Sequence, residues 1–132
     1  MLFRSVYTTH MRDEGDHVIE SIEETLETAR EAGVRVVISH HKCSGFRNFG
    51  RSRETLALIA AAQAGQDVHL DVYPYIASST VLLPSFMDDC PRVLITWSEP
   101  HPEQAGRDIA DIAAAWGDRK STRLKSSHGV IS

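Results

Sequence analysis

The order of the hydrophobic segments constrains this chain more than any other feature of its sequence. Two β-branched segments, Val6–His10 (VYTTH) and Val34–His40 (VRVVISH), predict strands, and a third, Val68–Tyr73 (VHLDVY), stops at Pro74. Helical patterns separate the three. Strands that alternate with helices favour parallel pairing with right-handed crossover connections. The sequence therefore predicts an α/β unit built on three parallel strands.

The segment between the first two predicted strands has the clearest helical pattern. Asp16 is expected to cap the N-terminus of this helix, and Gly33 is expected to end it in the left-handed conformation. Ser52 is expected to cap a second helix that runs to Gly65. The apolar residues that fall at helical spacing on one face of the first helix are Val18, Ile22, Leu26 and Ala29.

After Tyr75 the alternation of strands and helices breaks down. Residues 76–92 read as a loop, 93–97 as a strand, and 106–116 as a helix with Ile109, Ile112 and Ala113 facing inward. A parallel sheet needs cover on both faces. Three strands and two helices do not supply that cover, so we expect the unit to be incomplete.

Both ends of the chain have a different character. The C-terminal stretch DRKSTRLKSSHGVIS, residues 118–132, resembles a translated sequencing adapter from which only Lys125 departs. The N-terminal MLFRS, residues 1–5, resembles the opposite adapter. Fold reasoning therefore uses residues 6–117.

Composition and charge argue against several classes of function. A formal net charge of -4 argues against a nucleic-acid groove, so no nucleic-acid partner is predicted. No apolar run approaches the roughly 20 residues of a membrane-spanning helix, so no membrane partner is predicted either. Two cysteines without a disulfide framework or signal peptide favour a reduced, cytoplasmic location.

Three side chains that could bind a metal ion or take part in catalysis lie at the ends of the predicted strands. In a parallel α/β barrel, catalytic groups sit at the C-terminal ends of the strands, where His10, His40 and Tyr73 are found. Neutral imidazole is a common zinc ligand, so histidines on neighbouring strands can converge on one metal ion. The alternative is two structural histidines that bond to loop carbonyls. Spacing alone does not decide between these interpretations.

Four ungapped motifs carry a family resemblance over nearly all of residues 6–117. THMRDEGDHVIESIEET, VVISHHKCSG, NFGRSRETL and DVYPYIASST are similar in order and spacing to N-acyl-D-amino-acid deacylases, or D-aminoacylases, of the amidohydrolase superfamily. The resemblance implies a (β/α)8 TIM-like barrel of which this chain holds about strands five to seven. Residues 6–75 would be the partial barrel, 76–117 the start of an insertion, and 1–5 and 118–132 adapter-derived.

The resemblance also implies roles for individual residues. His10 and His40 would be metal ligands for zinc, one or two ions in the parent enzyme, with His41 as the competing second ligand. Tyr73 would be catalytic and would polarise the scissile carbonyl. Lys42 and Ser79 would contact the substrate carboxylate, and Arg12 would do the same or fix its loop. Each of these residues also has a purely structural interpretation. Lys42 would then be a solvated lysine, Tyr73 a core tyrosine and Ser79 an ordinary loop serine.

Two further groups within these motifs have side chains that suit catalysis or metal binding. Asp13 and Glu14 offer a carboxylate pair for acid–base work, but a solvated loop pair or a salt-bridge partner for Arg12 is the favoured interpretation. Cys43 is expected to be a small buried side chain and not a ligand.

The resemblance implies a parent enzyme that hydrolyses the amide bond of an N-acyl-D-amino acid, a small-molecule substrate, to a carboxylate and a D-amino acid. The rest of the barrel, including an HxH-type pair, a cysteine ligand and an SDG aspartate, is missing, so this chain alone is expected to be inactive and to bind metal weakly. The alternatives are an amidohydrolase for cyclic amides, like dihydroorotase or hydantoinase, and a binding module without catalysis. A binding module would unfold cooperatively, whereas a partial barrel would aggregate.

Overall fold

The computed structural model describes residues 5–83, 90–117 and 129–131. Most of the two segments that resemble adapters, residues 1–5 and 118–132, lies outside the described residues, so their origin stays a prediction. The chain divides into two compact units, residues 1–74 and 75–132, and each is considered by itself. Within the described ranges, no helix combines the length and the apolar character needed to cross a membrane.

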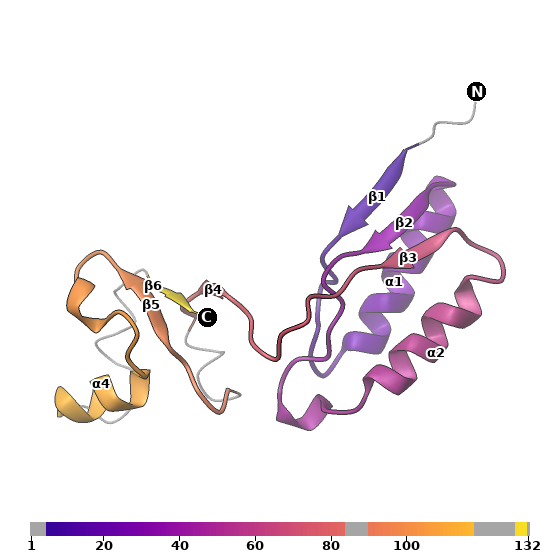
Figure 1. Ribbon diagram of the computed structural model, residues 1–132. Coiled ribbons are helices and arrows are strands. Elements are labelled where there is room, and N and C mark those ends of the chain that lie inside the picture. The colour runs from indigo at the N-terminus through magenta and orange to yellow at the C-terminus, as the bar shows by residue number, and fades with distance from the viewer. Residues whose placement is uncertain (1–4, 84–89, 118–128, 132) are drawn as a thin grey trace. The chain divides into compact units, whose positions relative to one another are not determined.

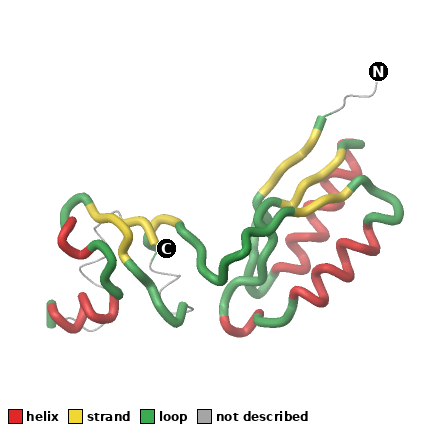
Figure 2. The backbone as a smooth tube through the Cα atoms, in the orientation of Figure 1, coloured by secondary structure: helices red, strands yellow, loops and turns green. Residues whose placement is uncertain are grey.

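The first unit is a three-stranded parallel sheet with two helices, as the alternation of segments predicts (Figures 1 and 2). The strands pair in the order β1-β2-β3, with Thr9 opposite Ile38 and Ile38 opposite Leu70. In chain order the elements are β1 (Val6–Thr9), α1 (Val18–Ala32), β2 (Arg35–Ile38), the 3-10 turn η1 (Phe46–Asn48), α2 (Ser52–Ala62) and β3 (Val68–Leu70).

The core of this unit lies between the helices and one face of the sheet. The four residues predicted to line the inner face of α1 are all buried: Val18, Ile22, Leu26 and Ala29. They pack with Ile59 of α2 and with Val36, Ile38 and Val68 of the strands. Full burial of one such aliphatic side chain stabilises the fold by about 1.5–3 kcal/mol, so this cluster holds the strands and helices together.

The alternate strand residues are much less covered. Val6 and Thr8 of β1 and His69 of β3 are exposed, and Val37 of β2 is only partly buried. One face of the sheet is therefore packed and the other is largely open within this unit, in line with the expectation of incomplete cover.

The predicted helix caps are partly wrong. Gly33 ends α1 at φ 64°, as expected. Asp16 does not cap the start of α1, because its carboxylate accepts instead from Asn48 Nδ2 at 3.0 Å. Ser52 is the first helical residue of α2 and forms no capping bond, and the helix ends at Ala62, before Gly65.

The strands are also shorter than predicted, so His10, His40 and Tyr73 follow their strands and do not close them. For β2 and β3 the reason lies in Asp71. Its backbone N–H donates to Ile38 O at 3.1 Å, its carbonyl accepts from His41 N at 2.8 Å, and its carboxylate accepts from His40 N at 2.6 Å. The side-chain bond replaces the next rung of the ladder and turns the chain at Ser39 and His40.

The second unit has an antiparallel sheet in the order β4-β6-β5. Its elements are β4 (Thr80–Val81), β5 (Ile95–Ser98), the 3-10 turn η2 (Pro102–Gln104), α4 (Ile109–Ala115) and β6 (Gly129–Ile131). Asp108 caps α4 by accepting from Ala110 N at 2.9 Å. Ile109, Ile112 and Ala113 are buried, as predicted.

Two expectations for this unit need correction. The region 76–92, expected to be loop, contains the short strand β4, which pairs with β6. The strand β6 lies within residues 118–132, which were left out of fold reasoning. Both strands are two or three residues long, too short to show a period-2 pattern.

Candidate metal and substrate site

Two loops that follow neighbouring strands bring two imidazoles together. His10 follows β1 and His40 lies two residues beyond β2, and their ring centroids are 4.3 Å apart with a tilt of 39°. Nε2 of His40 contacts Nδ1 of His10. One nitrogen of each imidazole therefore faces the other ring.

His40 has an unusual backbone conformation. Its φ of 42° makes it the one non-glycine residue in the left-handed region among residues 5–83, 90–117 and 129–131. Such a conformation costs on the order of 1–3 kcal/mol and persists only where neighbouring groups hold it. The hydrogen bond from His40 N to the Asp71 carboxylate stabilises this backbone conformation. The strain aims the imidazole at His10.

An ion pair lies directly behind the His40 ring. Glu14 Oε2 is 2.6 Å from Lys42 Nζ, and Glu14 Oε1 is 3.0 Å from His40 Nδ1. Lys42 Nζ also lies 2.7 Å from His40 Nδ1 and 3.1 Å from His40 O. The side chains are only 20–27% exposed. Lys42 is therefore not a solvated lysine, and its ammonium is held beside the imidazole pair.

The favoured expectation for Asp13 and Glu14, a solvated pair or a partner for Arg12, is wrong. Asp13 Oδ1 accepts from Gly15 N at 2.7 Å and from His17 N at 3.1 Å, so this carboxylate shapes the loop before α1. Glu14 points toward His40 and Lys42 instead. Successive side chains in this loop point in different directions, and no pattern in the sequence indicates which of the two carboxylates faces inward.

Tyr73 completes the cluster from the loop after β3. Lys42 Nζ lies 5.7 Å from the centroid of its ring, within range of a cation–π contact. Burial raises the pKa of the Tyr73 phenol, and the negative charge of Glu14 raises it further. The phenol is therefore protonated at neutral pH.

His41, the competing second ligand, faces elsewhere. It is buried, and its Nε2 pairs with Thr55 Oγ1 of α2 at 2.8 Å. Burial lowers the pKa of His41, and the charge of Glu14 opposes this only in part. Its ring belongs to the contact between the loop and α2, whereas the ring of His40 belongs to the imidazole pair.

Arg12 and Ser79 are the other two predicted substrate-binding residues. Arg12 forms an ion pair with Glu24 of α1, and its side chain is 77% exposed. Ser79 is exposed and belongs to the second unit. Their contacts with substrate stay predictions. Cys43 is partly buried against the core, close to the expectation for it.

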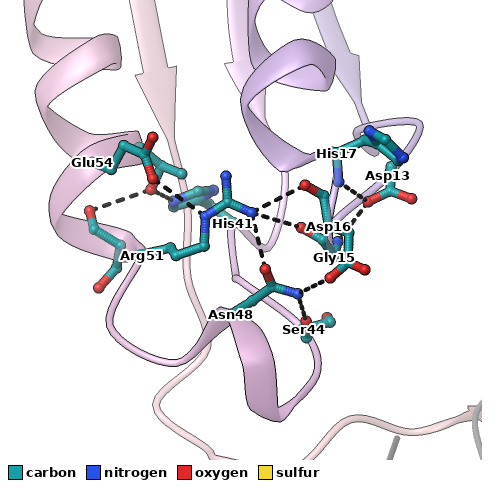
Figure 3. A network of polar contacts seen from close by, with 11 residues as sticks. Asp13, Gly15, Asp16, His17, His41, Ser44, Asn48, Arg51 and Glu54 are labelled. Atoms are coloured by element: carbon teal, nitrogen blue, oxygen red, sulfur yellow. Dashed lines mark hydrogen bonds and ion pairs between the residues drawn. The ribbon is translucent and has the colours of Figure 1, made fainter.

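A polar network ties together the two loops that carry the cluster (Figure 3). Arg51 Nη1 donates to Asp16 O at 3.1 Å and to Asn48 Oδ1 at 2.9 Å. Asn48 Nδ2 donates to Asp16 Oδ1 at 3.0 Å and to Ser44 O at 2.8 Å. Ser44 N donates to Glu14 O at 2.6 Å. The loop after β1 is thus fixed to the loop after β2, which sets Glu14 against Lys42.

The donor set suits zinc in kind but not in number. Imidazole nitrogens are preferred zinc ligands, and a catalytic zinc ion takes about three protein ligands plus water. Over the described ranges, no three histidine, cysteine, aspartate or glutamate side chains are arranged to hold one ion. The described residues therefore do not form a complete zinc site by themselves, and the roles of His10 and His40 as ligands stay predictions.

Relatives with curated functions resemble this chain over most of its length. A D-aminoacylase of Alcaligenes xylosoxydans xylosoxydans is 55% identical over 115 residues, which are 87% of this chain and 24% of that protein. An N-acyl-D-aspartate deacylase of the same organism is 50% identical over 86% of this chain and 23% of its own length. The chain spans about a quarter of the length of these relatives. No protein-family model matches it.

Solved structures agree with the sequence relatives. A D-aminoacylase structure, described as defining a novel subset of amidohydrolases, has a TM-score of 0.87 and 53% identity, over 96% of this chain and 27% of that one. An N-acyl-D-glutamate deacylase from Bordetella bronchiseptica, complexed with zinc and a phosphonate mimic of the tetrahedral intermediate, has a TM-score of 0.88 and 45% identity, over 97% and 28%. Another D-aminoacylase structure is described by its binuclear metal centre. By sequence and by fold, this chain belongs to the D-aminoacylase family of amidohydrolases.

Proposed function

We propose that this chain forms part of the catalytic centre of a zinc-dependent deacylase that hydrolyses the amide bond of N-acyl-D-amino acids. The products are a carboxylate and a free D-amino acid. The observation that carries the proposal is the convergence of the His10 and His40 imidazoles beside the Lys42 ammonium and the Tyr73 phenol. In this proposal β1, β2 and β3 are about the fifth to seventh strands of a (β/α)8 barrel, whose C-terminal rim carries the site.

His10 and His40 would hold zinc through Nδ1 and Nε2, the two nitrogens that face each other. One or two ions complete the centre in the whole protein, in keeping with the zinc and the binuclear centre described for the related structures. When bound, zinc lowers the pKa of a water molecule and polarises a carbonyl oxygen. The remaining protein ligands would come from residues other than those described.

Lys42 and Tyr73 would handle the substrate. The ammonium of Lys42 forms a charge-assisted hydrogen bond with the carboxylate of an N-acyl amino acid, which fixes its orientation. The protonated phenol of Tyr73 donates to the oxygen of the scissile carbonyl as negative charge develops there. Arg12 and Ser79 are proposed as further contacts to the substrate carboxylate. The proposal includes no general base among these residues, so this chain alone is expected to be inactive.

A chimera tests the proposal. Residues 6–117 replace the matching segment of the 55% identical D-aminoacylase, and hydrolysis of N-acetyl-D-amino acids and of cyclic ureides is measured. We expect hydrolysis of the linear D-substrates, little of their L-isomers and none of the cyclic amides. Lys42→Ala in the chimera should raise KM more than it lowers kcat, because it removes a contact to a part of the substrate that does not react. A folded, zinc-loaded chimera without deacylase activity would refute the assignment.

A further inference from the structure

Two adjacent histidines after β2 have different surroundings. The centroid of the His40 ring lies 4.3 Å from that of the His10 ring, at the end of the neighbouring strand. The ring of His41 is buried, and its Nε2 lies 2.8 Å from Thr55 Oγ1 of α2. Whatever distributes these two identical side chains therefore decides which imidazole reaches His10.

The alternation of side chains along β2 predicts the opposite distribution. Val36 and Ile38 are buried in the core, and Val37 between them lies on the less covered face of the sheet. If the strand continued with a period of two, His40 would share the buried face with Ile38, and His41 would share the open face with Val37. The observed directions are reversed, so one extra residue is inserted between Ile38 and His41.

The hydrogen bonds to Asp71 show where the extra residue enters. Asp71 N donates to Ile38 O at 3.1 Å, as in a regular parallel ladder, whose next bond would run from His40 N to Asp71 O. The carboxylate of Asp71 accepts from His40 N instead, at 2.6 Å, and Asp71 O accepts from His41 N at 2.8 Å. His41 therefore occupies the ladder position that His40 would otherwise occupy, which resembles the geometry of a β-bulge.

The inserted residue depends on a side chain for its conformation. His40 has a φ of 42°, whereas L-residues favour negative φ, so neighbouring groups must stabilise the turn. Two of the three hydrogen bonds that Asp71 makes here use its backbone, and any residue except proline could form both. The third uses the carboxylate, which is the group that distinguishes this turn from a continued strand.

We propose that Asp71 is a positioning residue that selects His40 over His41 for the imidazole pair. Its carboxylate binds the His40 backbone and inserts one residue at the end of β2, which turns the first imidazole toward His10 and the second toward α2. A one-residue change of register moves a side chain to the other face of a sheet, so a single hydrogen bond can control this choice. The consequence for zinc and substrate rests on the function proposed above, whereas the selection is a property of the chain itself.

Nuclear magnetic resonance tests the selection in the metal-free chain. Nuclear Overhauser effects from assigned ring protons report which imidazole lies beside His10 and which lies beside Thr55. In the unaltered chain we expect His40 beside His10 and His41 beside Thr55. In Asp71→Ala the ladder should continue through His40 N, so the two histidines should exchange these neighbours. A contact of His10 with His41 in the unaltered chain would overturn the proposal, whether or not any variant folds.

Further variants assign the effect to the carboxylate. Asp71→Asn keeps a side-chain oxygen as acceptor and should retain the contacts of the unaltered chain. If Asp71→Ala does not fold, Asp71→Leu replaces it, because leucine has a similar size and no acceptor. The matched control is Asp67→Ala, since Asp67 precedes the same strand and also reaches β2, but through side chains alone, with Oδ2 2.7 Å from Arg35 Nε. Unchanged contacts in a folded Asp71→Ala or Asp71→Leu variant, or an exchange in Asp67→Ala, would overturn the proposal.

Kinetics of the chimera described above provide an independent readout. Per molecule of folded enzyme, Asp71→Ala should lower kcat/KM for N-acetyl-D-amino acids about 10–100-fold, as is common for groups that orient a metal ligand. Asp71→Asn should restore most of this loss, and Asp67→Ala should leave kcat/KM unchanged. If the unaltered chimera folds but is inactive, the proposed function fails, yet the ring contacts still decide the role of Asp71. If Asp71→Ala is as active as the unaltered chimera, this proposal fails while the proposed function stands.

Discussion

Replacing Asn48 with alanine tests how far the fold of the two loops supports the site. Asn48 is the central residue of the network in Figure 3 and is only 4% exposed. Its side chain makes three hydrogen bonds: Nδ2 donates to Asp16 Oδ1 and Ser44 O, and Oδ1 accepts from Arg51. Each bond contributes about 0.5–1.5 kcal/mol net, so the loss of all three should destabilise the unit by about 2–3 kcal/mol.

The measurement is urea unfolding followed by circular dichroism. The matched control is Arg47→Ala, because Arg47 is the exposed neighbour of Asn48 in the same 3-10 turn. We expect a change within about 0.5 kcal/mol for the control, as for most exposed positions. A loss below about 0.5 kcal/mol for Asn48→Ala would show that the network does not hold the loops together, and the reasoning about Glu14 and Lys42 would lose its structural basis.

Three other predictions address the core, a helix end and pH. Ile22→Ala should destabilise by about 2–5 kcal/mol in thermal or urea unfolding because Ile22 is fully buried at the centre of the core; a loss under 1 kcal/mol would contradict that packing. Gly33→Ala should cost about 1 kcal/mol because φ is 64° there with open space around it, whereas Gly65→Ala, also in open space but without a positive φ, should be nearly neutral; equal effects would refute the conformational argument. Burial lowers the pKa of His41 in the folded state, so the unfolded chain binds more protons and stability should fall as pH drops below about 6.5; His41→Gln should flatten that slope, and an unchanged slope would contradict the assignment.

The sequence predicts the parallel unit well because its signals are local. The inner face of α1 follows from residues spaced three and four apart, and the αL end of α1 follows from Gly33, which has no Cβ to oppose a positive φ. Parallel pairing follows from the alternation of elements alone. These features depend on residues that are close in sequence, so one amino-acid sequence is enough to predict them.

The features that the sequence does not predict depend on distant residues. Asp16 is a good capping residue by type, but Asn48, 32 residues away, takes its carboxylate. The strands β2 and β3 end early because the Asp71 carboxylate accepts a hydrogen bond from the backbone of His40, 31 residues away. Glu14 looked like a surface carboxylate because nothing in its own segment shows that Lys42 faces it. The strands β4 and β6 are too short for a pattern to form.

The candidate site also combines features that local sequence predicts with features that it does not predict. The juxtaposition of His10 and His40 follows from their places after adjacent parallel strands, and the structure brings the two rings together as predicted. The choice of His40 over His41 as a ligand came from family resemblance and stays a prediction. The structure adds that His40 has a left-handed backbone and that the ring of His41 pairs with Thr55 instead of His10. The left-handed conformation of a histidine has no local signature in the sequence.

Metal binding by the two imidazoles tests the central claim most directly. Zinc is titrated into the chain by calorimetry, alongside the single variants His10→Ala and His40→Ala and a control that lacks the exposed His17 and His69. The account predicts one site, weaker than nanomolar because two protein ligands hold it, that is lost in either single variant and kept in the control. Binding that survives the loss of His10 or of His40 would contradict the claim that these side chains share one ion.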